Sequence, residues 1–229
     1  MVRASALRLA SRPSGWAALW ALVLALPALP ADPTPAPTAS APTASAPAPV
    51  AEVSPVAVVQ DLCDSLVSAM KSGPTLGFEG RRKALAPEIS RDLNLPLMTR
   101  IVVGPKWTTL SPTDRDSLVN AFSDFSIANY ANQFSSYSGE VFKVQPVTST
   151  MTSGDVVVKS VLIPKNGDAV HLDYLLRKTA GQWRVIDVFF NGTISSLAAR
   201  RSEYSATLSQ KGAPGLVTLL QQKTSDLSH

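Results

Sequence analysis

Residues 173–204 read DYLLRKTAGQWRVIDVFFNGTISSLAARRSEY and contain two segments with the composition of β-strands. Residues 174–176 and 183–190 are rich in aromatic and β-branched side chains, which suit pleated, half-buried strands. Between them, Thr179-Ala180-Gly181-Gln182 has the length of a hairpin connection, in which glycine supplies the turn geometry. The stretch therefore predicts an antiparallel hairpin.

A helix is predicted to follow this hairpin. Asn191-Gly192 is a turn signal that ends the second strand, and Thr193 is expected to cap the helix. A helix that leaves a twisted hairpin packs back across one face of the sheet. Such a layer can enclose an apolar hollow.

The surrounding chain reads as helices, then strands, then helices. Strands are predicted at residues 140–147, 155–163, 169–177 and 182–190, and helices at 56–71, 78–93, 97–104, 112–134, 194–210 and 214–225. The second helix is expected to be interrupted near Pro87, and Ser54-Pro55 is expected to open the first. The turns between strands are short, which predicts an antiparallel meander. The fold class is therefore α+β, a four-stranded antiparallel sheet with helices packed on one face around an apolar cavity.

The N-terminus has the pattern of an export signal. Arg3, Arg8 and Arg12 precede an apolar run over residues 16–29. A run of about 14 residues is too short to cross a bilayer of ~30 Å as a helix but suits a signal-peptide core. We predict a signal peptide over residues 1–31, cleaved after Ala31. The alternative is an uncleaved N-terminal anchor; a lipoprotein is disfavoured because no cysteine follows the apolar run.

Cleavage would change the charge of the protein. The chain has 21 basic and 17 acidic residues, and loss of three arginines leaves 18 basic residues. Nucleic-acid binding needs a concentrated basic face, which a nearly neutral mature chain lacks. We therefore expect no nucleic-acid partner.

Residues 32–55 are predicted to be a linker. They consist mostly of Pro, Ala, Thr and Ser without any aromatic residue, and such a composition cannot bury enough apolar surface to fold. Residues 56–229 remain, a length that suits one domain with a sizeable core.

The chain offers few groups for catalysis or metal binding. Cys63 is the only cysteine and lies on the apolar side of a helical pattern, so a buried side chain is favoured over a reactive thiol. The two histidines are His171, within a predicted strand, and His229. We predict no catalytic residue, no metal site and no cofactor.

In order and spacing, several segments resemble the MlaC or toluene-tolerance family of periplasmic lipid carriers. The resemblance covers about residues 56 to 226 and rests on residues 95–100, 104–107, 122–130, 174, 181–188, 191–195, 201–204, 212–220 and 223. Where the family usually has a Tyr-Arg pair, this chain has Arg200-Arg201. The Pro-rich linker and the Asn-Gly turn bring the chain nearer the hopanoid-associated branch of the family.

This resemblance implies a function and a set of partners. It implies an NTF2-like or MlaC-like fold and a periplasmic carrier that shields the tails of a phospholipid or a hopanoid-like lipid. The partners implied are an inner-membrane ABC transporter complex and an outer-membrane complex, with only transient membrane contact. Because each CH₂ group gains about 0.8 kcal/mol on leaving water, the carrier needs a large apolar cavity.

The chain can supply walls for such a cavity from predicted helices and strands. The candidate lipid-binding residues are Leu97, Met98, Ile101, Val102, Phe122, Phe125, Tyr130, Leu172, Tyr174, Leu176, Ile186, Val188 and Phe190, with Arg201 near the mouth. Each apolar residue of this set would equally suit an ordinary core, because cavity lining and core packing use the same amino acids.

Two other classes of function remain open. One is an isomerase-like enzyme with Asp187 and Tyr174 as an acid–base pair, which requires a carboxylate inside the pocket. The other is a periplasmic adaptor whose apolar surface binds protein, which a solid core would favour.

Overall fold

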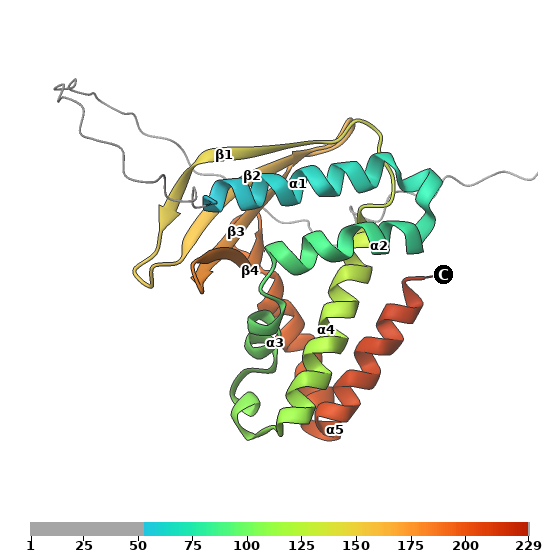
Figure 1. Cartoon of the computed structure of the whole chain (residues 1–229), viewed down its shortest axis with the longest axis vertical. Helices are drawn as coiled ribbons and strands as arrows, with labels where there is room; N and C mark the ends of the chain where they lie inside the picture. The colour runs from blue at the N-terminus through green and yellow to red at the C-terminus, as the bar shows by residue number, and fades with distance from the viewer. Residues whose placement is uncertain (1–52, 229) are drawn as a thin grey trace, which may run out of the picture. The chain divides into compact units, whose positions relative to one another are not determined.

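The computed structural model describes residues 53–228, and the predicted signal peptide and most of the predicted linker lie outside them. The elements follow one another as α1 (Pro55–Lys71), α2 (Gly73–Asp92), α3 (Leu95–Val103), the 3₁₀ helix η1 (Gly104–Thr109), α4 (Pro112–Gln133), β1 (Val141–Thr150), β2 (Val156–Ile163), β3 (Val170–Thr179), β4 (Gln182–Phe190), β5 (Ile194–Ser195) and α5 (Ser196–Asp226) (Figure 1). The predicted α+β class is confirmed. Ser54 caps α1 as predicted and accepts a hydrogen bond from the Ala57 amide at 3.1 Å.

The strands form one antiparallel sheet in the order β1-β2-β3-β4-β5. It has one strand more than predicted, because Asn191 (φ 49°) and Gly192 (φ 70°) turn the chain back to pair β5 with the end of β4. The prediction that Thr193 caps the following helix is therefore wrong. The cap is Ser195, whose hydroxyl accepts from the Ala198 amide at 2.9 Å.

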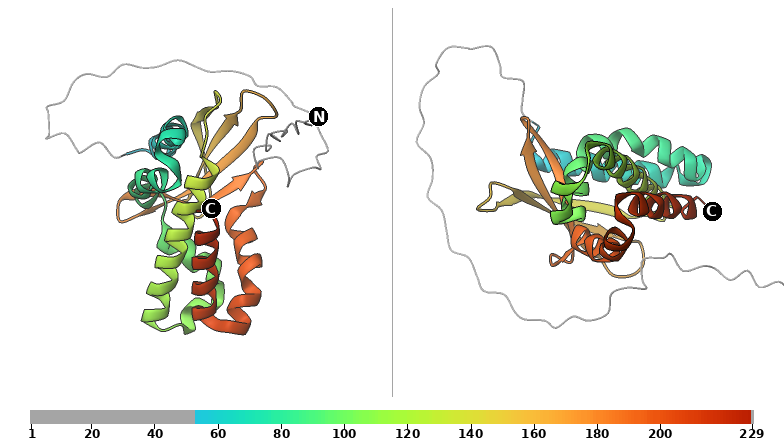
Figure 2. Two further views of the ribbon diagram at one scale, coloured as in Figure 1. Left: turned by 90° about the vertical axis from the view of Figure 1, so that its right-hand side faces the viewer. Right: turned by 90° about the horizontal axis from the view of Figure 1, so that it is seen from below.

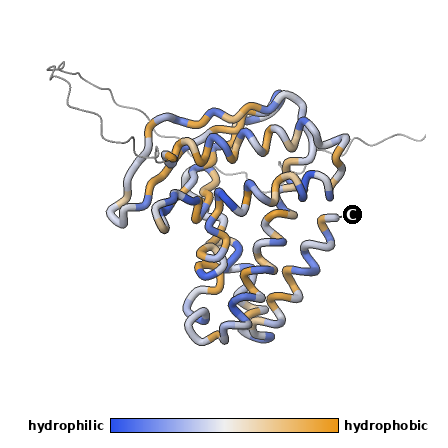
Figure 3. The backbone as a smooth tube through the Cα atoms, in the orientation of Figure 1, coloured by the Kyte–Doolittle hydropathy of each residue, from blue (hydrophilic) through white to orange (hydrophobic). Residues whose placement is uncertain are grey.

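Helices cover the sheet and also extend beyond it. α1 crosses one face of the sheet with α2 beside it, while α3, α4 and α5 gather in a bundle that projects from the sheet (Figures 1 and 2). Apolar positions recur along each helix and strand among polar ones (Figure 3), as elements with one buried side require. Of the helices, α1 makes the most extensive contact with the sheet, and α2, α3 and α5 each contact β4.

Glycines, not proline, break the two long helices. Gly77 (φ 61°) interrupts α2 and Gly212 (φ 66°) interrupts α5, whose halves run side by side in Figure 2. Lys223 joins these halves through an ion pair with Glu203 at 2.6 Å. The predicted interruption near Pro87 is wrong, since α2 continues through it. Pro87 is exposed, so water can bind the carbonyl that the proline leaves without an amide partner.

The turn between β3 and β4 contains only Ala180 and Gly181, with φ values of 50° and 80°. A turn with two residues at positive φ has the backbone twist that hairpins favour, but the alanine side chain disfavours that conformation. Gly181 supplies one of the two positive-φ positions, as predicted, and Ala180 occupies the other.

Ala180→Gly is expected to raise the free energy of unfolding by about 0.5–1 kcal/mol, because glycine removes the strain at positive φ. Urea unfolding checks this. The matched control Ala206→Gly, at an exposed position within α5, should instead cost about 1 kcal/mol. A loss of stability in both variants would contradict the interpretation.

Asp155, immediately before β2, forms a bidentate ion pair with Arg177 of β3. The Arg177 Nε and Nη2 atoms lie 2.7 and 2.6 Å from the Asp155 carboxylate oxygens. Asp155 is 5% exposed, and the guanidinium lowers the pKa of its carboxyl below the usual value. The pair fixes the β2–β3 register at the end of the sheet.

Because the pKa of Asp155 is lower in the folded than in the unfolded state, its stabilisation is present at neutral pH and lost as the pH falls through the folded pKa. The Arg177 side chain is 43% exposed, so the contribution is about 0.5–1 kcal/mol. Asp155→Asn should therefore be less stable than wild type in urea at pH 7 and nearly equal to it in strong acid. A constant difference at both pH values would contradict this, and Asp168→Asn in an exposed loop serves as the control.

Strand β1 borders β2 with an irregular register. Val144 pairs with Ser160 and Thr148 with Val158, so three residues of β1 oppose one of β2. Pro146 lies within this bulge, and Val147 beside it is 73% exposed.

Candidate functional site

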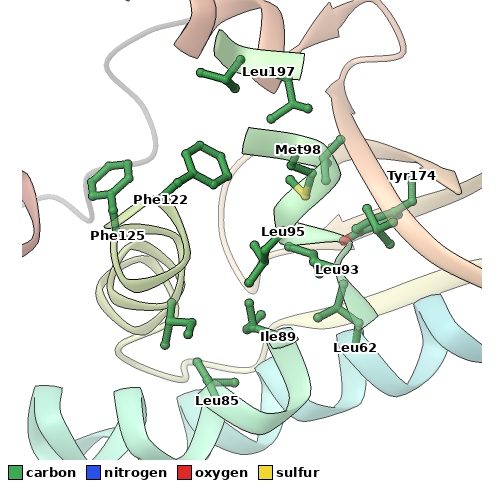
Figure 4. Close-up of a cluster of buried hydrophobic side chains, with 14 of the residues drawn as sticks. Leu62, Leu85, Ile89, Leu93, Leu95, Met98, Phe122, Phe125, Tyr174 and Leu197 are labelled. Atoms are coloured by element: carbon green, nitrogen blue, oxygen red, sulfur yellow. The ribbon is translucent and has the colours of Figure 1, made fainter. Parts of the chain in front are cut away.

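Most of the predicted lipid-binding residues belong to one buried cluster. Figure 4 shows part of this interior, with Met98, Phe122, Phe125 and Tyr174 among its labelled residues. It lies between the helices and one face of the sheet, here called the inner face and defined by Leu172, Tyr174 and Leu176 of β3. The buried members of the predicted set that belong to this cluster are Met98, Val102, Phe122, Phe125, Leu172, Tyr174, Leu176 and Val188, and Ile101, Tyr130 and Phe190 are half-buried against them. The sequence pattern therefore located a single continuous cluster.

Three predicted residues lie elsewhere. Leu97 is half-buried and lies outside this cluster, and Arg201 is exposed. Ile186 is buried but does not belong to the inner row of β4. A bulge places Leu176 opposite Val185 and Leu175 opposite Asp187, so Ile186 is the extra residue and Val185 takes its place.

A contact from outside the sheet accompanies this bulge. Leu93, at the end of α2, bridges to Val185, and the Asn94 amide donates to the Val185 carbonyl at 2.8 Å. The row on β4 is thus Val185, Val188 and Phe190. Alternation along the strand predicted Ile186 because it assumes an unbroken period of two.

Polar groups from three elements meet inside this apolar cluster. The Cys63 Sγ atom of α1 lies 3.8 Å from the Tyr174 hydroxyl, and both residues are at most 2% exposed. Burial raises the pKa of Cys63 to about 12, which keeps the thiol protonated, as expected for an inert buried cysteine. Burial and the neighbouring Cys63 and Tyr130 raise the pKa of Tyr174 well above its usual value.

Ser160 adds a third polar group on the inner face of β2. It is 1% exposed, and its hydroxyl has no hydrogen-bond partner among the described residues. It lies near enough to the Tyr174 hydroxyl to act on that group's pKa, but the two make no well-formed hydrogen bond. Sequence reasoning missed Ser160, because a serine in a strand is normally assigned to the exposed face.

Tyr130 of α4 also belongs to this interior. Its ring stacks on Phe134 at 5.9 Å, and Phe134 in turn contacts Phe142 of β1 at 6.1 Å. Burial raises the pKa of Tyr130 to about 12, with an opposing effect from Arg200. Tyr130 and Tyr174 are therefore neutral at physiological pH and add no negative charge to the interior.

Asp187 and Tyr174 do not form the acid–base pair of the enzyme hypothesis. Tyr174 pairs with Val188 and Asp187 with Leu175, so their side chains point to opposite faces of the sheet. The Asp187 carboxylate instead accepts hydrogen bonds from the amides of Val188 (2.7 Å) and Leu197 (3.2 Å) and from the hydroxyls of Ser195 and Ser196. It anchors the start of α5, which is a structural role.

The two arginines near the start of α5 have different surroundings. Arg200 lies over the Phe125 ring, 4.9 Å from its centroid, and donates to the Tyr204 hydroxyl at 3.3 Å. The Arg201 guanidinium lies against Gly104, where an added Cβ would be 3.0 Å from it. Arg201 is exposed, and its guanidinium lies at the junction of α3 and η1.

The predicted walls pack against one another in this structure. Two surface grooves, of about 350 and 170 Å³, lie between helices, and both are lined largely by polar residues. None of the predicted residues lines either groove. A lipid that enters the interior would have to separate side chains that are now in contact.

Within residues 53–228 no three His, Cys, Asp or Glu side chains are grouped to hold a metal ion. None of the helices in that range is long and apolar enough to cross a membrane.

Comparison with known proteins identifies a family, a sequence relative and a similar solved structure for this chain. The profile of the MlaC protein family matches residues 60–222. The intermembrane phospholipid transport system binding protein MlaC of Haemophilus influenzae is 24% identical over 186 residues, which covers 77% of this chain and 85% of the relative. The phospholipid-binding protein of Ralstonia solanacearum, solved in complex with a phospholipid, superposes with a TM-score of 0.65 at 22% identity, over 76% of this chain and 98% of that one. The chain belongs to the MlaC protein family.

Proposed function

We propose that this protein is a periplasmic carrier that encloses the tails of a phospholipid and passes it between the outer membrane and an inner-membrane ABC transporter. The observation that carries the proposal is the convergence of apolar rows from β3, β4, α3 and α4 on one interior, in a chain of this family. The named functions of the two relatives support the choice of a phospholipid. Export by a signal peptide over residues 1–31 and the hopanoid-associated assignment remain predictions.

Energetics explain why such a carrier is needed. At about 0.8 kcal/mol per CH₂ group, the free energy of transferring a lipid tail of ~16 carbons into water is more than about 10 kcal/mol. The interior offers apolar side chains that can surround the tails in place of the membrane, and the exposed Arg201 beside Gly104 can pair with a phosphate headgroup. Opening of the packed core is the step that would admit the tails.

The experiment is lipid extraction from protein purified without detergent after export by a bacterial host. Mass spectrometry of the organic extract is expected to find close to one diacyl lipid per protein molecule. Val188→Phe fills the inner face and should lower the co-purified lipid several-fold. The matched control Val161→Phe adds the same bulk to the opposite face of the sheet and should leave the lipid content unchanged.

The close packing of the predicted walls also favours a second candidate, an adaptor that binds protein instead of lipid. Repeated preparations with no lipid in wild type, together with equal behaviour of Val188→Phe and Val161→Phe, would support the adaptor and contradict the carrier.

A further inference from the structure

The interior contains a group that a pure lipid-tail site does not need. Ser160 lies on β2 with Val144 and Leu172 as its cross-strand neighbours, and Val158 and Leu162 flank it on the same face. A buried hydroxyl without a partner costs free energy, and native proteins rarely keep one without a reason. Alanine would fit the same space without this cost.

The groups around Ser160 favour a neutral ligand. Tyr174 is its diagonal neighbour across β2 and β3, and Cys63 approaches the tyrosine hydroxyl from α1. Both titratable groups stay protonated because of their burial. A hydroxyl group on a ligand can donate to one of these atoms and accept from another, whereas a charged group would remain unneutralised there.

We propose that Ser160, Tyr174 and Cys63 form a polar subsite that recognises a hydroxyl group on the buried portion of the lipid. The inference rests on the proposed carrier function and adds a specificity to it: among lipids with the same headgroup, those hydroxylated along the tail bind more tightly. One added hydrogen bond to an otherwise unpaired group corresponds to about a three- to tenfold preference.

The test is a competition between tails. Wild-type protein is incubated with vesicles that contain equal amounts of stearoyl and monohydroxystearoyl phosphatidylethanolamine, in a series that moves the hydroxyl along the chain. After separation from the vesicles, mass spectrometry measures the ratio of the two lipids on the protein. At least one positional isomer is expected to be enriched about three- to tenfold.

Variants identify the groups responsible. Ser160→Ala and, independently, Tyr174→Phe should bring the ratio toward that in the vesicles. Thr99→Val is the matched control, because Thr99 is also buried but its hydroxyl already donates to the Leu95 carbonyl at 2.8 Å. Thermal melts show whether each variant is folded, and Tyr174→Phe serves if Ser160→Ala is not.

The outcomes separate this inference from the carrier function. Suppose that wild type takes up plain and hydroxylated lipids equally, whatever the position of the hydroxyl along the tail. This result would overturn the subsite but leave the carrier function intact. It is the result expected if a structural water bonds to Ser160. Persistent enrichment in Ser160→Ala and Tyr174→Phe would also overturn it. If the wild-type protein carries neither of the two lipids, the carrier function itself is contradicted.

Discussion

Removal of bound lipid is expected to lower the melting temperature of the protein by about 5–10 °C. A ligand that binds only the folded state at 100 times its dissociation constant stabilises it by about 2.7 kcal/mol. For a domain of this size, each kcal/mol shifts the melting temperature by about 2–4 °C. The gain arises because the lipid tail contacts side chains of the folded interior that have no fixed arrangement in the unfolded chain.

Differential scanning calorimetry on stripped protein, before and after addition of phosphatidylethanolamine vesicles, measures this shift. Val188→Phe should show a smaller shift on addition of lipid, and Val161→Phe should behave like wild type. A change below about 1 °C in wild type would mean that no lipid binds the folded state appreciably.

Asp187→Ala is expected to lower the free energy of unfolding by about 3 kcal/mol, the largest loss among the substitutions considered. The side chain is 8% exposed and accepts from two amides and two serine hydroxyls. Its removal leaves the buried Val188 and Leu197 amides without this acceptor and frees the start of α5 from β4. Urea unfolding at neutral pH measures the loss.

Two variants test the origin of that effect. Asp173→Ala removes a carboxylate from the same face of the neighbouring strand and should change stability by less than about 0.5 kcal/mol. Asp187→Asn keeps the shape of the side chain and should retain lipid transfer in the folded protein. Loss of a substrate turnover in Asp187→Asn, without loss of stability, would instead revive the enzyme hypothesis.

The sequence predicted the strands well because their side chains repeat every two residues against a buried face. The repeat placed Leu172, Tyr174 and Leu176 together on β3. It failed at Ile186, because the bulge accompanies a bridge from Leu93, which lies about ninety residues earlier in the chain. Local periodicity cannot report a contact of that separation.

The cap of α5 was also mispredicted, because it depends on a contact that the local sequence does not show. Thr193 and Ser195 are both good caps by residue type, and the choice depends on whether β5 pairs with β4. That pairing and the hydrogen bonds to Asp187 are tertiary. The position of the Ser160 hydroxyl was likewise beyond sequence reasoning, since only the packed neighbours show that it is buried without a well-formed hydrogen bond.

The bulge in β1 has a consequence for the behaviour of the protein at high concentration. An outermost strand with a free row of amides and carbonyls can template a strand from another molecule and start a fibril. Pro146 supplies no amide for such pairing, and the bulge around it bends the row, so only short stretches on either side remain regular. The exposed Val147 therefore lies where a strand from another molecule cannot continue to pair with β1. Strand β1 can thus lie at the edge of the sheet without promoting fibril formation.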